Sequence, residues 1–218
     1  GPFMSDFSSW GPAPDLSIKP EITAHGGSIL SSVPGQSYDR ISGTSMATPN
    51  ISGITALLRQ YVIENFKDIA NDSVAVNAMV NQLMMSTADV LRGQNGLPYS
   101  VRKQGAGLAN LMSSINTTAY ITTYDEGGKV MDKTKLELGD DPDKTGRYVL
   151  NFTVENFGDA TLTYDVGAYV FTEGVSETKT GAGKTTVTEE AYILDGASVV
   201  VTTSDSEGGH LKDGQVTV

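Results

Sequence analysis

The stretch RISGTSMATPNISG, residues 40–53, places Ser45 between a Gly-Thr pair and a Met-Ala pair, directly before an apolar pattern with helical period. A serine at such a junction can cap the helix, as Ser and Thr often do, or it can be a nucleophile that needs a partner to take its proton. Free N–H groups and the positive end of the helix dipole at a first helical turn would stabilise an oxyanion. Gly43 would allow a close approach there, and Ala47 would leave space clear. Taken alone, the Gly-Thr-Ser triplet favours the cap.

The residues around this junction predict three helices. From Asn50 to Ile63, apolar side chains recur at steps of three and four residues and form one stripe, made of Ile51, Ile54, Leu57, Leu58, Tyr61 and Val62. A second helix is predicted with Ser73 as its N-cap, and its expected buried face is Val76, Met79, Val80, Leu83 and Met84. A third, shorter helix is predicted over about 107–115. Before residue 40, Pro and Gly interrupt short apolar pieces, which indicates strands and loops.

After Asn116 the pattern changes to that of β-strands. The stretch RYVLNFTVEN, residues 147–156, puts Tyr148, Leu150, Phe152 and Val154 on one face. The stretch TLTYDVGAYVF, residues 161–171, alternates Leu162, Tyr164 and Val166 in the same way, and SVVVTT, residues 198–203, predicts another strand. Acidic or Gly-containing connectors separate these stretches, so we predict an antiparallel β-sandwich. The domains are therefore expected over residues 1–116 and 117–218.

Composition narrows the classes of function. The 218 residues are 39% hydrophobic, which fits a globular protein with a real core. The net charge of −11 argues against a nucleic-acid partner, because phosphate binding needs a basic surface. Residues 1–118 carry 8 acidic and 7 basic side chains, whereas residues 119–218 carry 18 acidic and 8 basic ones. No apolar run reaches 18 residues, so no membrane span is expected, and without cysteine there is no disulfide or thiolate site.

Three motifs occur in a fixed order: FSSWGP at 7–12, KPEITAHGGSILSSVPG at 19–35 and SGTSMATP at 42–49. Their order and spacing resemble the approach to the nucleophile helix in subtilisin-like serine peptidases, and QGAGLANLMSSI at 104–115 resembles the end of that catalytic domain. The β half resembles the fibronectin-III-like domain that follows it in cell-envelope subtilases of Gram-positive bacteria, the group that includes lactocepins and streptococcal C5a peptidase. The resemblance implies an α/β fold, the C-terminal part of a subtilisin-like parallel-sheet domain, followed by an all-β fibronectin-III/Ig-like sandwich. We expect this sandwich to be truncated, because the chain stops in the strand-like GQVTV.

The resemblance also assigns roles to residues. It implies that Ser45 is the nucleophile and supplies one oxyanion donor from its own backbone N–H, and that the Thr44 hydroxyl assists there. In subtilisins the chain order is Asp, His, Ser, so the Asp, the His and the oxyanion-hole Asn are expected upstream of residue 1. His25 stands where the family usually has Pro, and His210 lies in a Gly-rich loop, so neither is expected to be the base. Asn50 stands where the family commonly has His.

The function implied is that of a secreted, cell-wall-associated serine endopeptidase acting on protein or peptide substrates, with no cofactor required. The 218 residues alone are expected to be inactive. Without the first strands of the family's sheet, Ile51 to Val62 would be exposed, rearranged or buried by another copy, so we expect self-association or pairing with the upstream half as a separate chain. The alternative is a binding or structural module of a pseudo-peptidase or adhesin, in which the β-sandwich is the functional unit.

Weaker signals remain. The stretch DPDKTG, residues 141–146, imitates the opening of a calcium loop, with Asp141 and Asp143 at alternating positions. Phe152 stands where such a loop needs Glu, so a solvated turn is the favoured interpretation and structural calcium the alternative. Asn50 heads one of four glycosylation sequons, but its expected place on a buried helix argues against modification. Trp10, the only tryptophan, is expected to be a packed aromatic.

Overall fold

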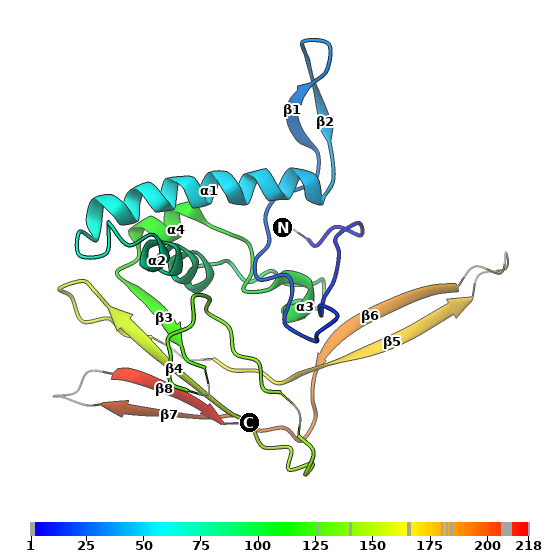
Figure 1. The fold of residues 1–218 in the computed structure, drawn as a ribbon. Helices are drawn as coiled ribbons and strands as arrows, with labels where there is room; N and C mark the ends of the chain where they lie inside the picture. The colour runs from blue at the N-terminus through cyan, green and yellow to red at the C-terminus, as the bar shows by residue number, and fades with distance from the viewer. Residues whose placement is uncertain are drawn as a thin grey trace.

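The computed structural model describes residues 3–125, 127–139, 141–164, 167–179, 181, 183, 185–205 and 211–217. His210 and Val166 therefore lie outside the described residues. The first half contains a hairpin and four helices (Figure 1), which are β1 (Ile29–Val33), β2 (Ser37–Ile41), α1 (Thr44–Asn65), α2 (Ser73–Ser86), α3 (Val101–Gln104) and α4 (Leu111–Asn116). The second half contains the strands β3 (Ala119–Thr123), β4 (Val149–Asn156), β5 (Phe171–Lys179), β6 (Thr185–Ile193), β7 (Val200–Asp205) and β8 (Leu211–Thr217).

Helix α1 begins at Thr44 rather than at Asn50, where the apolar period predicted it. Pro49 therefore lies inside the helix. A proline has no N–H to donate to the carbonyl four residues earlier, here that of Ser45, and it is therefore unfavourable beyond the first turn. The helix continues through Pro49 and places Ser45 in its own first turn.

The core lies between α1 and α2. Leu58 and Val62 of α1 and Val76, Val80 and Leu83 of α2 are buried to 1% exposure or less, and Met84 to 4%. The buried face predicted for α2 is confirmed at these positions. Its N-cap is Asp72 rather than Ser73, because the Asp72 carboxylate accepts hydrogen bonds from the N–H groups of Val74 (2.9 Å) and Ala75 (3.1 Å).

The apolar stripe of α1 is better covered than the sequence suggested. Leu58 and Val62 are fully buried, and Ile51, Ile54 and Tyr61 pack against the same core. Residues from α2, α4 and β3 supply the cover, including Leu111, Ile115 and Tyr120. The expectation that the whole stripe would lack a partner is therefore wrong; Leu57 is the exception, with 54% of its surface exposed.

A parallel contact joins the segment before the hairpin to the segment before α4. Thr23 and Leu108 form a parallel bridge, and the Thr23 N–H donates to the Gly107 carbonyl at 2.9 Å. Leu108 also pairs antiparallel with Asp89. In the described part of the chain, parallel pairing is limited to this bridge, and the named strands all pair antiparallel.

The β half forms a four-stranded sheet with the order β3-β4-β8-β7, and β5 and β6 form a separate hairpin that extends away from it (Figure 1). In and just before β4, Tyr148, Leu150 and Phe152 are half-buried while Val149 and Asn151 are exposed, as predicted. Thr153 departs from the alternation, because it lies on the face of Val149 and Asn151 in the predicted strand but is buried at 7% exposure. The prediction of a strand over residues 161–171 is wrong for the described residues, since β5 begins only at Phe171. Alternation is a local pattern, whereas a strand also needs a hydrogen-bonding neighbour. Among the described strands, no second sheet faces the first, so a sandwich is not confirmed.

The two halves pack against each other through aromatic rings. Phe66, which follows α1, makes an edge contact with Phe157 at 5.2 Å between ring centroids, and Phe157 lies 6.1 Å from Tyr120 of β3. The Ile121 N–H donates to the Ser86 hydroxyl at 2.8 Å, which ties β3 to the end of α2. The boundary predicted at residue 116 coincides with the end of α4, and it stays a prediction.

We predict that Leu58→Ala will lower the free energy of unfolding by about 3 kcal/mol, because it leaves a cavity in a fully buried site. The neighbouring Leu57→Ala is the matched control and should change it by less than about 0.5 kcal/mol, because Leu57 is mostly exposed. Urea unfolding followed by circular dichroism measures both. Equal losses in the two variants would contradict this description of the core.

Candidate active site

Ser45 is the second residue of α1, whose N-cap is Gly43. The helix has no side-chain cap, and the exposed Ser45 hydroxyl makes no hydrogen bond to any described residue. The interpretation of Ser45 as a cap is therefore wrong. As a first-turn residue, it also has an N–H without an intrahelical acceptor. Thr44 is exposed beside it, and its carbonyl accepts a hydrogen bond from the Thr48 hydroxyl at 3.1 Å.

The backbone of Gly26 supports the turn that begins α1. The Gly43 N–H donates to the Gly26 carbonyl at 2.8 Å. A Cβ atom on Gly26 would lie 2.7 Å from the Gly43 carbonyl oxygen and 3.3 Å from the Ala47 Cβ. Gly43 and Ala47 are therefore in close contact with Gly26, and the close approach to the oxyanion position that they were expected to allow stays a prediction. In the sequence, the signal for this contact is the pair Gly26-Gly27.

The hairpin β1-β2 is tied to the same turn. The Ser28 N–H donates to the Ser42 hydroxyl at 2.8 Å, and the Arg40 guanidinium donates to the Ser28 carbonyl at 2.9 Å. Figure 1 shows the hairpin projecting beside the N-terminal end of α1. The segment that leads into Ser45 is thus tied to the Ser28 backbone by the side chains of Arg40 and Ser42.

The other residues singled out from the sequence lie as follows. His25 is exposed next to Gly26, and in the described structure it makes no hydrogen bond to Ser45. Asn50 is exposed on α1, so the expectation that it would be buried is wrong. Trp10 keeps 44% exposure, with the Lys103 ammonium 3.9 Å from the centre of its ring, so it is partly packed through a cation–π contact.

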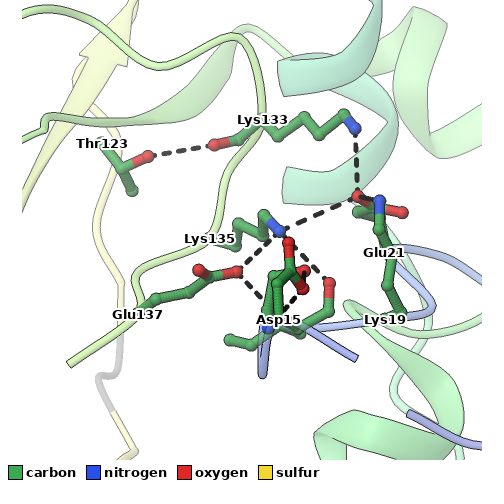
Figure 2. A network of polar contacts seen from close by, with 9 residues as sticks. Asp15, Lys19, Glu21, Thr123, Lys133, Lys135 and Glu137 are labelled. Atoms are coloured by element: carbon green, nitrogen blue, oxygen red, sulfur yellow. Dashed lines mark hydrogen bonds and ion pairs between the residues drawn. The ribbon is translucent and has the colours of Figure 1, made fainter. Parts of the chain in front are cut away.

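A cluster of charged side chains surrounds Glu21 (Figure 2). The Glu21 carboxylate binds Lys19 of its own segment and Lys133 of the β half, the latter at 3.0 Å, and the Lys135 ammonium lies 3.8 Å away. Lys135 also binds Glu137 at 2.8 Å. We call these five side chains the Glu21 cluster. Sequence patterns did not indicate this cluster, because it joins residues 19–21 to residues 133–137, which lie more than a hundred residues away in the chain.

The cluster lowers the pKa of its carboxylates. Partial burial would raise the pKa of Glu21, but hydrogen bonds from Lys19 and Lys133 and the charges of both lysines lower it from the usual 4.5 to about 2. The pKa of Glu137 is also lowered, first by its hydrogen bond from Lys135 and then by one from the Ile18 N–H. The ionised form of each carboxylate is therefore favoured in the folded chain.

In the candidate calcium loop, the Asp141 carboxylate binds the turn itself. Asp141 accepts from the N–H and hydroxyl groups of Thr145 at 3.0 and 3.1 Å, and from the Gly146 N–H at 2.7 Å. The hydrogen bonds from Gly146 and then Thr145 lower the pKa of Asp141. Both of its oxygens hold the turn, while Asp143 is exposed. Within the described residues, no group of three or more His, Asp or Glu side chains is placed to hold a metal ion, and calcium binding here stays a prediction.

None of the helices among the described residues has the length and apolar character needed to span a bilayer.

We predict that Gly26→Ala will destabilise the chain by about 2 kcal/mol, because the new Cβ must displace the turn before Ser45. The adjacent Gly27→Ala is the control, since its Cβ would meet nothing closer than the Ser5 hydroxyl at 3.9 Å. It should stay within about 1 kcal/mol of the wild type. Thermal and urea unfolding compare the three proteins, and indifference to Gly26→Ala would refute the contact.

The second prediction concerns acid stability. A folded-state pKa of about 2, below the unfolded 4.5, means that Glu21 contributes stability above pH 4.5 that is lost as the pH falls toward 2. Glu21→Gln should lower the free energy of unfolding at pH 6 by about 1.5 kcal/mol, the contribution of a hydrogen bond to a charged group. The difference from the wild type should shrink between pH 4.5 and 2. Urea midpoints over this range test it, with exposed Glu64→Gln as the control; a constant difference would count against the cluster.

Comparison with known proteins places the first half in a family. The model of the subtilase family, Peptidase_S8, matches residues 2–107. The chain is 34% identical over 160 residues to C5a peptidase of Streptococcus pyogenes. This match covers 73% of the present chain and 13% of the C5a peptidase. It is 32% identical over 205 residues to PII-type proteinase of Lacticaseibacillus paracasei, covering 90% of this chain and 10% of that protein.

Among solved structures, the prenylagaramide maturation protease PagA is 29% identical and matches 51% of this chain and 36% of its own, with a TM-score of 0.39, which is too low to establish a fold by itself. The chain spans about an eighth or less of the curated relatives named above. The family match agrees with the α/β class predicted for the first half. Residues 2–107 of this chain belong to the subtilase family.

Proposed function

We propose that this chain supplies the nucleophile of a serine endopeptidase and that Ser45 is that nucleophile. The observation that carries the proposal is the position of Ser45, exposed in the first turn of α1 with its hydroxyl unbound by any described residue. The hydroxyl oxygen of a capping serine would accept a hydrogen bond from a backbone N–H. Here the hydroxyl stays available to a substrate, in a chain whose first half belongs to the subtilases.

The start of α1 suits acyl transfer. The Ser45 Oγ would attack the carbonyl carbon of the scissile peptide bond, and its proton would pass to a general base and then to the leaving amine. The negative charge on the carbonyl oxygen would be stabilised by the Ser45 N–H and the positive end of the helix dipole. We assign the Thr44 hydroxyl, exposed at the preceding position, to the same oxyanion.

The base is assigned to residues outside these 218. His25 makes no hydrogen bond to Ser45, and subtilisins carry Asp and His before Ser in the chain. The curated relatives are also far longer than this chain. We therefore propose that Asp, His and an oxyanion-hole Asn come from another part of a longer peptidase, and that the 218 residues alone are inactive.

For the β half we propose a fibronectin-III-like domain of a secreted, cell-surface peptidase with protein substrates. The similarity to the PII-type proteinase supports this, because it extends over 205 residues and so includes much of the β half. The antiparallel sheet β3-β4-β8-β7 is compatible with one layer of such a domain.

A fluorophosphonate probe, which reacts with activated serines, tests the assignment. In the full-length protein that contains this chain, we predict stoichiometric labelling of the tryptic peptide with Ser45, and its loss in Ser45→Ala. Ser52→Ala, which changes an exposed serine on the same helix, is the matched control and should label like the wild type. Peptide mapping by mass spectrometry locates the label.

Three outcomes would overturn parts of the proposal. Labelling of the full-length protein at another serine would show that Ser45 is not the nucleophile, and a full-length protein that is not labelled at all would favour a binding module. Rapid labelling of the 218-residue chain alone at Ser45 would show that a base lies within it.

A further inference from the structure

We propose that Glu21 is a positioning residue, through which Lys133 and Lys135 of the β half help to hold the turn that presents Ser45. The inference rests on the proposed function only for the role of Ser45. It makes the β half part of the support of the active site rather than an appended domain.

The first step links Ser45 to Gly26. The N-cap Gly43 lies two residues before Ser45, and its N–H donates to the Gly26 carbonyl at 2.8 Å. Because a Cβ on Gly26 would come within 2.7 Å of the Gly43 carbonyl oxygen, the two backbones are in direct contact. A shift of Gly26 therefore has to move the start of α1.

The second step links Gly26 to Glu21 along a short extended segment. The Glu21 carbonyl accepts from the Ala106 N–H at 2.9 Å, and Thr23 exchanges backbone hydrogen bonds with Gly107 and Ala109 at 2.9 Å. Gly105 passes so close that a Cβ there would lie 2.2 Å from the Glu21 carbonyl carbon. Residues 21–23 are thus held against residues 105–109, and only Ala24 and His25 separate them from Gly26.

The third step links Glu21 to the β half. Lys133 binds the Glu21 carboxylate at 3.0 Å, and Lys135, whose side chain is only 17% exposed, lies 3.8 Å from it (Figure 2). The same stretch also holds the backbone of Ile18, because Glu137 accepts from its N–H at 2.8 Å and Lys135 donates to its carbonyl at 3.2 Å. Residues 18–21 are thereby held at side chain and backbone.

The lysines themselves are anchored. The Lys133 carbonyl accepts from the Thr123 hydroxyl at 3.0 Å, and the Thr134 hydroxyl donates to the Ile121 carbonyl at 3.0 Å. Both partners lie on β3, which is tied to the end of α2 through Ser86. The Glu21 cluster therefore connects the nucleophile segment to a part of the fold that packs on the core.

Amide hydrogen exchange of the 218-residue chain, measured by NMR, tests the link. In Glu21→Gln, the N–H groups of Gly43 and Ala106 should exchange about tenfold faster, because the segment that they bind opens more often. The N–H of Val76, which donates to Asp72 at the start of α2, should keep its wild-type rate. Lys133→Met should reproduce the effect, and the double variant Glu21→Gln with Lys133→Met should add little to it. Lys133→Arg, which keeps the positive charge, should exchange as slowly as the wild type. Glu64→Gln, on the exposed face of α1, is the charge-matched control.

Unchanged exchange at Gly43 in both Glu21→Gln and Lys133→Met would overturn the inference. So would an equal acceleration at Gly43 and Val76, because that is the sign of general destabilisation. Lys133→Met gives an answer even if Glu21→Gln does not fold. The result is independent of catalysis: failure of probe labelling at Ser45 would leave the exchange data intact, and the reverse also holds.

Discussion

The contact between the backbones of Gly26 and Gly43 decides how Ser45 is presented. It fixes the beginning of α1 by tertiary packing, without a side-chain cap. As a result the first-turn N–H groups are not taken by a side chain, and the Ser45 hydroxyl is not taken by the backbone. A conventional cap would strengthen the helix and occupy the groups that an oxyanion needs. The helix can form without such a cap, because burial of Leu58 and Val62 stabilises it about four to five turns further along.

The two halves are joined by interactions of different kinds. The aromatic contacts around Phe157 bury apolar surface and contribute mainly stability. The Glu21 cluster is a partly buried ion network, in which the cost of desolvation offsets much of the electrostatic attraction. Its main effect is therefore to fix the position of the Glu21 segment relative to the β half. It also shows why net charge is a poor guide to local contacts. In this cluster, the half with 18 acidic residues contributes two lysines to Glu21 of the first half.

Local patterns predicted the parts of this structure that local physics controls. The period of α2 gave its buried face, and the ordered motifs indicated Ser45, which the structure places in a first helical turn. The cap of α2 was missed by one residue because Asp and Ser stand side by side and both can cap. The pairing of Glu21 with Lys133 spans 112 residues, and no periodicity or spacing encodes it. The same holds for Gly26, whose need for hydrogen instead of a methyl group appears only when Gly43 is folded against it.

The chemistry at Ser45 divides into a part that the helix supplies and a part that it does not. The N–H of Ser45 and the helix dipole are set by the start of α1, so this share of the stabilisation of an oxyanion lies within the chain, whereas the oxyanion-hole Asn is assigned to another part of the peptidase. Proton transfer is different, because a base must lie within hydrogen-bond reach of Oγ, and no described side chain does. The exposed side of Ser45 is the side from which such a base must approach. In the proposed mechanism, the Glu21 cluster supports the turn through Gly26 and Gly43, and the base that activates Ser45 comes from another part of the protein.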